Sequence, residues 1–115
     1  MRRGDVYVAQ VVPRSGSEQT GTRPVVVVSN DGFNAVPSWR SVIAVPLSTS
    51  ASQARRGPTA VPIAAGIGGI QRDSVALCHQ VTTLDRSKLK SYVGSLPEEV
   101  LRAVDDGLRA SLDLG

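Results

Sequence analysis

The sequence predicts a mainly β (α+β) fold, a small and strongly bent β-barrel or sheet closed by a C-terminal amphipathic helix. Aromatic residues make up only 3% of the chain, so aliphatic side chains must form the core. The many valines and glycines, with punctuating prolines, favour strands over a helical bundle. The end of the chain predicts the helix, because apolar residues recur there at helical spacing. With 115 residues, the chain fits a single domain over residues 1–115.

Strands are expected where short apolar runs end in turn-forming residues. The four valines at residues 25–28 have no polar alternation, which is typical of a strand buried on both faces. Polar loops are expected over residues 14–22 and 48–58, and a glycine-rich turn over residues 66–69. The strands expected from this pattern cover residues 5–12, 24–29, 41–47, 60–63, 74–81 and 92–94.

The C-terminal helix is expected over residues 96–112. Ser95 and Glu98 match the S-x-x-E capping box, and Pro97 falls in the first turn, where proline is tolerated. Gly107 in the helix interior costs about 1 kcal/mol relative to alanine. We interpret the apolar face of the helix as core, with its positions at Val100, Leu101, Val104, Leu108 and Leu112.

Several kinds of site are excluded by the residues available. With one histidine and one cysteine, a zinc site of the usual kind lacks ligands, and no Gly-x-x-x-x-Gly-Lys-Ser/Thr loop occurs. A serine hydrolase triad would need His79, which falls within an expected strand and far from any nucleophile elbow. Cys78 lies in an apolar run and is interpreted as a core thiol. We therefore expect neither a metal ion nor a cofactor.

The charges and the absence of a leader bear on location and partners. No charged-then-apolar leader and no membrane-spanning apolar run occur, so we expect a cytoplasmic protein without a membrane partner. Residues 1–72 carry eight Lys and Arg against three Asp and Glu, whereas residues 73–115 carry five against seven. This asymmetry has two readings: ordinary solvation of two faces, or a basic surface for a polyanion.

Arg23 is the leading candidate for a functional residue. It is a permanently charged five-donor group between a glycine-bearing loop and the valine strand, an arrangement that suits a phosphate. The chemistry that remains uses an arginine and hydroxyls, and its leading candidate is metal-free RNA cleavage, in which the 2′-hydroxyl attacks its own phosphate. We assign Arg23 as charge clamp and as proton donor to the leaving oxygen, because arginine is a poor proton acceptor. The alternative is a surface ion pair between Arg23 and Glu18.

Short motifs in order along residues 2–112 carry a resemblance to a known family. They are Arg3-Gly4-Asp5-Val6-Tyr7, Gly16-Ser17-Glu18-Gln19, Arg23-Pro24, Ser29-Asn30-Asp31 with Asn34, Pro46-Leu47-Ser48, Arg72-Asp73-Ser74-Val75 and the segment from Gln80 to Asp85. This ordered set resembles MazF/PemK-type toxins of type II toxin–antitoxin systems. The resemblance implies an SH3-like β-barrel, a homodimer, and a sequence-specific, metal-independent endoribonuclease toxin that cleaves single-stranded RNA (mRNA). It also implies a cognate antitoxin protein that occupies the RNA groove.

The resemblance also implies the site residues. In that family the arginine of the Arg-Pro step and a threonine that ends the third strand carry catalysis, which points to Arg23 and Ser48 here. Serine keeps the hydroxyl but loses the β-branch that restricts χ1, so either Ser48 or the adjacent Thr49 supplies the hydroxyl. The expected RNA-binding residues are Ser17, Glu18, Gln19, Asn34, Thr49, Arg55, Arg56, His79 and Gln80.

Two other functions stay open from the sequence. One is a protein-poisoning toxin of the CcdB kind, which acts on DNA gyrase and shares the fold. That family uses an aromatic residue near its C-terminus, whereas the single tryptophan here is Trp39. The other is a non-catalytic RNA-binding module, with Ser48 marking lost activity. Phe33 and Trp39 suit base stacking, but we favour core anchoring or a dimer contact for them.

Overall fold

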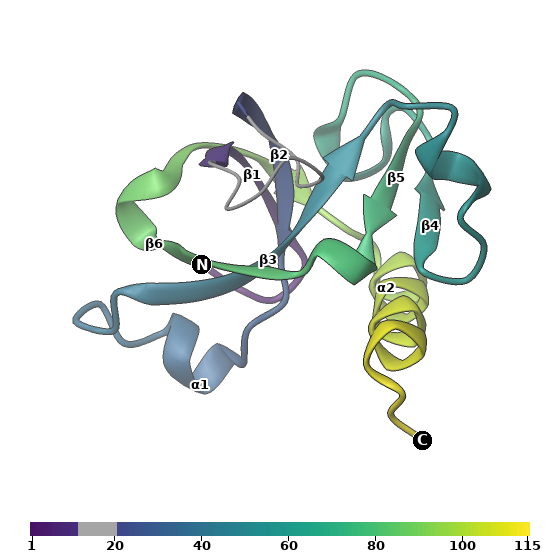
Figure 1. Cartoon of the computed structure of the whole chain (residues 1–115). Helices are drawn as coiled ribbons and strands as arrows, with labels where there is room; N and C mark the ends of the chain where they lie inside the picture. Colours follow the sequence, from purple (N-terminus) through teal and green to yellow (C-terminus); the bar gives the residue numbers. More distant parts are fainter. Residues whose placement is uncertain (12–20) are drawn as a thin grey trace.

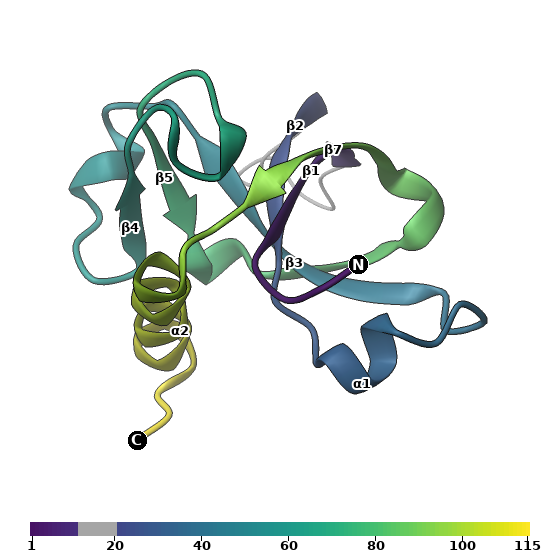
Figure 2. The same cartoon turned by 180° about the vertical axis from the view of Figure 1, so that it is seen from behind.

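The computed structural model describes residues 1–11 and 21–115, which form one seven-stranded antiparallel sheet and two α-helices. The helices are α1 (Asp31–Asn34) and α2 (Glu98–Leu112), which lie at opposite ends of the sheet (Figures 1 and 2). The prediction of a mainly β fold with a C-terminal helix is confirmed. The strands are β1 (Asp5–Val11), β2 (Gly21–Val27), β3 (Ser41–Ser48), β4 (Ala60–Ile63), β5 (Ser74–Leu77), β6 (Thr82–Asp85) and β7 (Leu89–Ser95).

The strand β3 is the element around which the sheet bends. The strand order is β4-β5-β3-β2-β1-β7, and β6 also pairs with β3. The first residues of β3 pair with β6, from Ser41 opposite Asp85 to Ala44 opposite Thr82. Its last two residues, Leu47 and Ser48, pair instead with β5. The sheet therefore consists of two parts that share β3, as Figure 1 shows.

The valine run lies in and just after β2 and is buried as predicted. Val25, Val26 and Val27 are fully buried, and Val28 is 9% exposed. Val26 and Val28 belong to the main hydrophobic core, whereas Val25 packs in a second cluster with Ala9. Successive side chains of a strand point to opposite faces, so both faces of this strand are covered. This arrangement explains why the run shows no polar alternation.

The structure corrects several expected boundaries. The strand β2 begins at Gly21 rather than residue 24, because Gly21 and Thr22 pair with β1. The strand expected over residues 74–81 ends at Leu77, and Cys78–Gln80 form a 3₁₀ turn, so the placement of His79 in a strand is wrong.

Three further elements differ from the sequence-based expectation. The strand β6 was not expected, and β7 is longer than the expected residues 92–94. The helix α1 was not expected, and at its start the Asn30 side chain accepts a hydrogen bond from the Gly32 N–H.

The helix α2 begins at Glu98, and the predicted capping box is wrong. Pro97 is the N-cap residue, and no side chain caps this end. Ser95 stays in β7, where its hydroxyl donates a hydrogen bond to Asp5 Oδ1 at 2.7 Å. Neither helix of the described residues has the length and apolar character that crossing a membrane requires.

The helix α2 packs closely on the core through Gly107. A Cβ atom on Gly107 would lie 2.7 Å from the Sγ of Cys78 and 2.8 Å from Cγ2 of Val61. Cys78 is fully buried, and burial raises the pKa of its thiol to about 11. The interpretation of Cys78 as a core thiol is confirmed.

Candidate functional site

A pocket of about 470 Å³ opens where β2 and β3 separate. The two strands pair only from Val25 opposite Pro46 to Val27 opposite Ala44, because β3 then turns to pair with β5. The loop that precedes β5 and one residue of β7 complete the walls. The lining residues are Val8, Thr22, Arg23, Pro24, Leu47, Thr49, Gly69, Ile70, Gln71, Arg72, Ser74 and Val93.

Arg23 lies in this pocket at the point where the strands part. It is the third residue of β2, lies opposite Ala9 of β1 and is half-buried. Its Nη1 atom donates a hydrogen bond to the carbonyl oxygen of Leu47 at 3.4 Å. The guanidinium is thus held beside the end of β3, next to the residues that the sequence predicts as its hydroxyl partners.

Ser48 and Thr49 occupy different positions relative to the pocket. Ser48 is only 5% exposed, and its Oγ accepts a hydrogen bond from the Ser50 N–H at 3.1 Å. That bond uses an acceptor position of the hydroxyl and leaves its proton available to donate. Thr49 is exposed and lines the pocket together with Arg23. Thr49 is therefore part of the pocket lining, whereas the adjacent Ser48 is buried and is not among the lining residues.

Of the other expected contacts, those that the structure describes do not line this pocket. Ser17, Glu18 and Gln19 lie outside the described residues. Asn34 is 3% exposed, and its side chain bonds to the Ser29 carbonyl and hydroxyl at 2.8 and 2.6 Å. Asn34 thus fixes the start of the α1 region through buried hydrogen bonds to Ser29.

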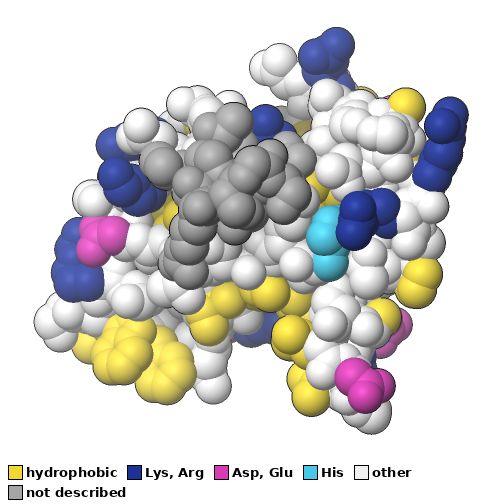
Figure 3. Space-filling model, viewed as in Figure 1, with side chains coloured by type: hydrophobic (Ala, Val, Ile, Leu, Met, Phe, Trp, Pro, Cys, Tyr) yellow, Lys and Arg dark blue, Asp and Glu magenta, His cyan; other side chains and the backbone are white. Residues whose placement is uncertain are grey.

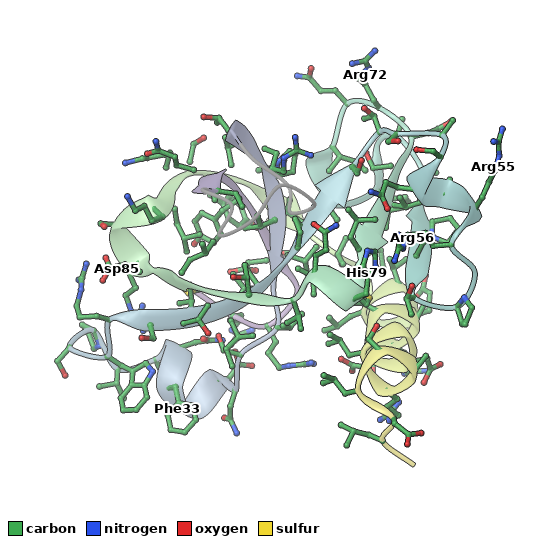
Figure 4. The ribbon with its side chains drawn as sticks, in the orientation of Figure 1. Phe33, Arg55, Arg56, Arg72, His79 and Asp85 are labelled. Carbon is green, nitrogen blue, oxygen red and sulfur yellow. The ribbon has the colours of Figure 1, made fainter. Side chains whose placement is uncertain are left out.

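A basic cluster lies between the β3–β4 connection and the turn after β5. His79 and Arg56 lie side by side in Figure 4, whereas Arg55 points away. The pKa of His79 is lowered, first by burial and then by the positive charge of Arg56. The Gln80 Nε2 atom is 3.4 Å from Nε2 of His79. Figure 3 shows the histidine and a basic side chain adjacent on one face, so this cluster can contact a polyanion outside the pocket.

The stacked rings of Phe33 and Trp39 form an exposed patch rather than part of the core. Their centroids are 4.9 Å apart at an interplanar angle of 16°, and they are 48% and 47% exposed. Val36, 43% exposed, belongs to the same connection between β2 and β3. We call Phe33, Val36 and Trp39 the aromatic patch. Of the two interpretations favoured for these rings, core anchoring is wrong, and a dimer contact stays a prediction.

Arg86 holds the connection that carries the aromatic patch. Its Nη2 atom donates to the carbonyl oxygens of Phe33, Asn34 and Val36 at 3.1, 2.9 and 3.0 Å. Its Nε atom donates to the carbonyl of Trp39. One guanidinium therefore bonds to four carbonyl oxygens of α1 and the segment after it. The carbonyls of Phe33 and Val36 also accept the backbone N–H groups of Val36 and Trp39.

The sequence reasoning missed the pocket residues that precede β5. Gln71 and Arg72 line the pocket together with Ser74, the first residue of β5, and Arg72 points outward from its rim in Figure 4. The signal was present, because Arg72 and Ser74 belong to a motif that contributed to the family resemblance. Arg23 precedes Gln71 by 48 residues in the sequence. Only the folded chain brings the two residues to the same pocket.

Comparisons with known proteins agree along nearly the whole chain. The family model for the PemK-like, MazF-like toxin of type II toxin–antitoxin systems matches residues 2–112. The chain is 40% identical to endoribonuclease EndoA of Bacillus subtilis (strain 168) over 114 residues, which cover 99% of this chain and 96% of that protein.

Two solved structures are also similar. An endoribonuclease in complex with its cognate antitoxin, from a mycobacterial species, is 26% identical with a TM-score of 0.75, covering 98% of this chain and 95% of that one. The Mycobacterium tuberculosis toxin MazF-mt6 has a TM-score of 0.78 at 22% identity, covering 96% and 98%, and supports the fold.

Proposed function

Because this chain belongs to the PemK-like, MazF-like toxin family of type II toxin–antitoxin systems, we propose that it cleaves single-stranded RNA by a metal-independent, sequence-specific reaction. The chain is an endoribonuclease toxin of this family. The observation that carries the proposed mechanism is the Arg23 guanidinium, held in a pocket beside the end of β3. We place the reaction in the cytoplasm, on mRNA.

The reaction uses a nucleophile that the RNA itself supplies. The 2′-hydroxyl attacks the adjacent phosphorus, the bond to the 5′-oxygen breaks, and the products are a 2′,3′-cyclic phosphate and a 5′-hydroxyl. Arg23 binds the non-bridging oxygens through two N–H groups as negative charge builds up on them, and donates a proton to the leaving oxygen. Water accepts the proton that the 2′-hydroxyl loses and returns one to Arg23, so the cleavage consumes and releases no net proton. Removing one such donor typically slows an enzyme about 10²–10³-fold.

Ser48 supplies the fixed hydroxyl in this proposal, and Thr49 contacts the RNA. The Leu47 carbonyl bonds to Arg23, so the next residue, Ser48, lies close to the guanidinium. The Ser50 N–H holds the Ser48 hydroxyl oxygen and leaves the proton to donate toward the phosphate. Thr49 forms part of the lining through which the RNA enters.

Three substitutions test these roles in buffer containing EDTA. Arg23→Ala is expected to abolish cleavage of a long RNA while the thermal melt stays nearly unchanged. Ser48→Ala is expected to reduce cleavage at least 100-fold, and Thr49→Val to reduce it by less than tenfold. Retained cleavage by Arg23→Ala would refute the role of Arg23, and the reverse order of the other two variants would move the hydroxyl to Thr49. RNA that binds the unmodified protein but stays intact would favour a binding-only function.

We also propose two protein partners. The first is a cognate antitoxin that covers the Arg23 pocket and competes with RNA, since a similar endoribonuclease crystallised with its cognate antitoxin. The second is another copy of this chain, with the aromatic patch in the interface, because exposed contiguous apolar surface is typical of interfaces. Sedimentation should detect a dimer that the double substitution Phe33→Ser and Trp39→Ser dissociates. Leu112→Ser, at a comparably exposed leucine outside the patch, is the matched control.

A further inference from the structure

The loop between β4 and β5 is mounted rigidly as a wall of the Arg23 pocket. Its 3₁₀ turn, Ile67–Gly69, lies directly against the backbone of β7. A Cβ atom on Gly69 would lie 2.3 Å from the Val93 carbonyl oxygen, and one on Gly94 would lie 2.5 Å from the Gly68 oxygen. Only glycine permits two backbones to approach this closely.

The remainder of the same loop is closed by its own hydrogen bonds. The Ala65 N–H donates to Oδ1 of Asp73 at 2.9 Å, which joins the two ends of the loop. The Gly66 N–H donates to the Ile70 carbonyl at 2.8 Å. The loop therefore presents Gln71 and Arg72 from a fixed frame, which is what a residue that reads a ligand requires.

The pocket has an apolar interior and a polar rim. Aliphatic side chains line it, with Leu47 and Ile70 among them, and its volume lies in the range of small-molecule sites. Ser74, the first residue of β5, already donates its hydroxyl proton to the Arg72 carbonyl at 2.9 Å. Gln71 is exposed and carries both a donor and an acceptor on one planar group.

We propose that this pocket holds the base of a nucleotide adjacent to the scissile phosphate, and that Gln71 reads its hydrogen-bonding edge. The inference rests on the proposed endoribonuclease function, which places the phosphate at Arg23. Single-stranded RNA exposes the edges and faces of its bases, and a side-chain amide pairs with such an edge through two hydrogen bonds. Arg72, which points outward, contacts the RNA backbone and carries no sequence information.

Cleavage-site mapping on a pool of random-sequence RNA tests this assignment. Gln71→Ala is expected to change the preference at one position of the recognised sequence by about 5- to 100-fold, while the preferences at the other positions stay unchanged. Arg72→Ala is the matched control from the adjacent residue. It is expected to slow cleavage uniformly at all sites and to make the rate less sensitive to salt.

The outcomes separate this inference from the function on which it rests. A Gln71→Ala profile identical to that of the unmodified protein, or one reduced uniformly, would overturn the role of Gln71 and leave the endoribonuclease function intact. RNA left intact by the unmodified protein would overturn both. Thermal melts of both variants check that the exposed substitutions leave the fold unchanged.

Discussion

Replacing Gly107 with alanine is expected to destabilise the protein, although helix propensity alone predicts the opposite. In an exposed helix interior, Gly→Ala adds about 1 kcal/mol of stability. Gly107 is instead buried where α2 packs on the core. The new methyl group would lie 2.7 Å from Cys78 Sγ, 2.8 Å from Val61 Cγ2 and 3.3 Å from Cys78 Cβ.

The size of the effect follows from these contacts. Ordinary contact distances between such atoms begin at roughly 3.5 Å, so the helix must move outward or two buried side chains must shift. Inserting a methyl group into a well-packed core typically costs about 1–3 kcal/mol. After the propensity gain of about 1 kcal/mol, we expect a net loss of up to about 2 kcal/mol in the free energy of unfolding.

Chemical denaturation with a linear-extrapolation fit measures this change directly. The double variant Cys78→Ala/Gly107→Ala provides the control, because it removes the Sγ atom that the new methyl group meets most closely. In the Cys78→Ala background, Gly107→Ala should cost less than it does alone. A Gly107→Ala protein more stable than the unmodified one, or an equal cost in both backgrounds, would refute this account of the α2 packing.

Three other perturbations test local features. Arg86→Lys should lower the free energy of unfolding by about 1–3 kcal/mol, because an ammonium cannot replace the carbonyl contacts of the guanidinium. It should also shift the fluorescence emission of the single tryptophan, and unchanged emission would contradict the role of Arg86 in holding this segment. The pKa of Asp85 is lowered to about 2 by hydrogen bonds from Ser87 and then Arg40, so its stabilisation is present above about pH 4 and lost as the pH falls through about 2. Asp85→Asn should therefore weaken the pH dependence of the melting temperature in that window, and an unchanged profile would argue against it. The ring-proton NMR signal of His79 should titrate below pH 6.5, and Arg56→Gln should raise that pKa; an equal pKa in both proteins would show that Arg56 has no influence.

The strand pattern was predictable where local composition decides the structure. The buried valine run, the short strand at residues 60–63 and the terminal helix all appear near their expected positions. The strand β6 was missed because Thr82 and Asp85 lack an apolar pattern, and its pairing with β3 holds it in place. Ser95 failed as a helix cap because a tertiary partner, Asp5, bonds to its hydroxyl.

The candidate site was predictable only in part, for a comparable reason. Arg23 could be identified from its own flanking residues, since its chemistry and its strand lie together in the sequence. Gln71 could not be identified in this way, because it reaches the pocket only through the glycine contacts between the β4–β5 loop and β7. The structural role of Asn34 and the carbonyl contacts of Arg86 likewise depend on burial and on long-range contacts.

The central claim is that the RNA's own 2′-hydroxyl is the nucleophile and that Arg23 stabilises the charge it creates. Once the cleavage site is mapped, the most direct measurement uses an RNA oligonucleotide with one 2′-deoxy substitution at that site, incubated in EDTA beside its all-ribose counterpart. The account predicts no cleavage of the substituted RNA, and a 2′,3′-cyclic phosphate with a 5′-hydroxyl from the all-ribose RNA. Cleavage of the 2′-deoxy substrate at a comparable rate, or products with a 5′-phosphate, would contradict it.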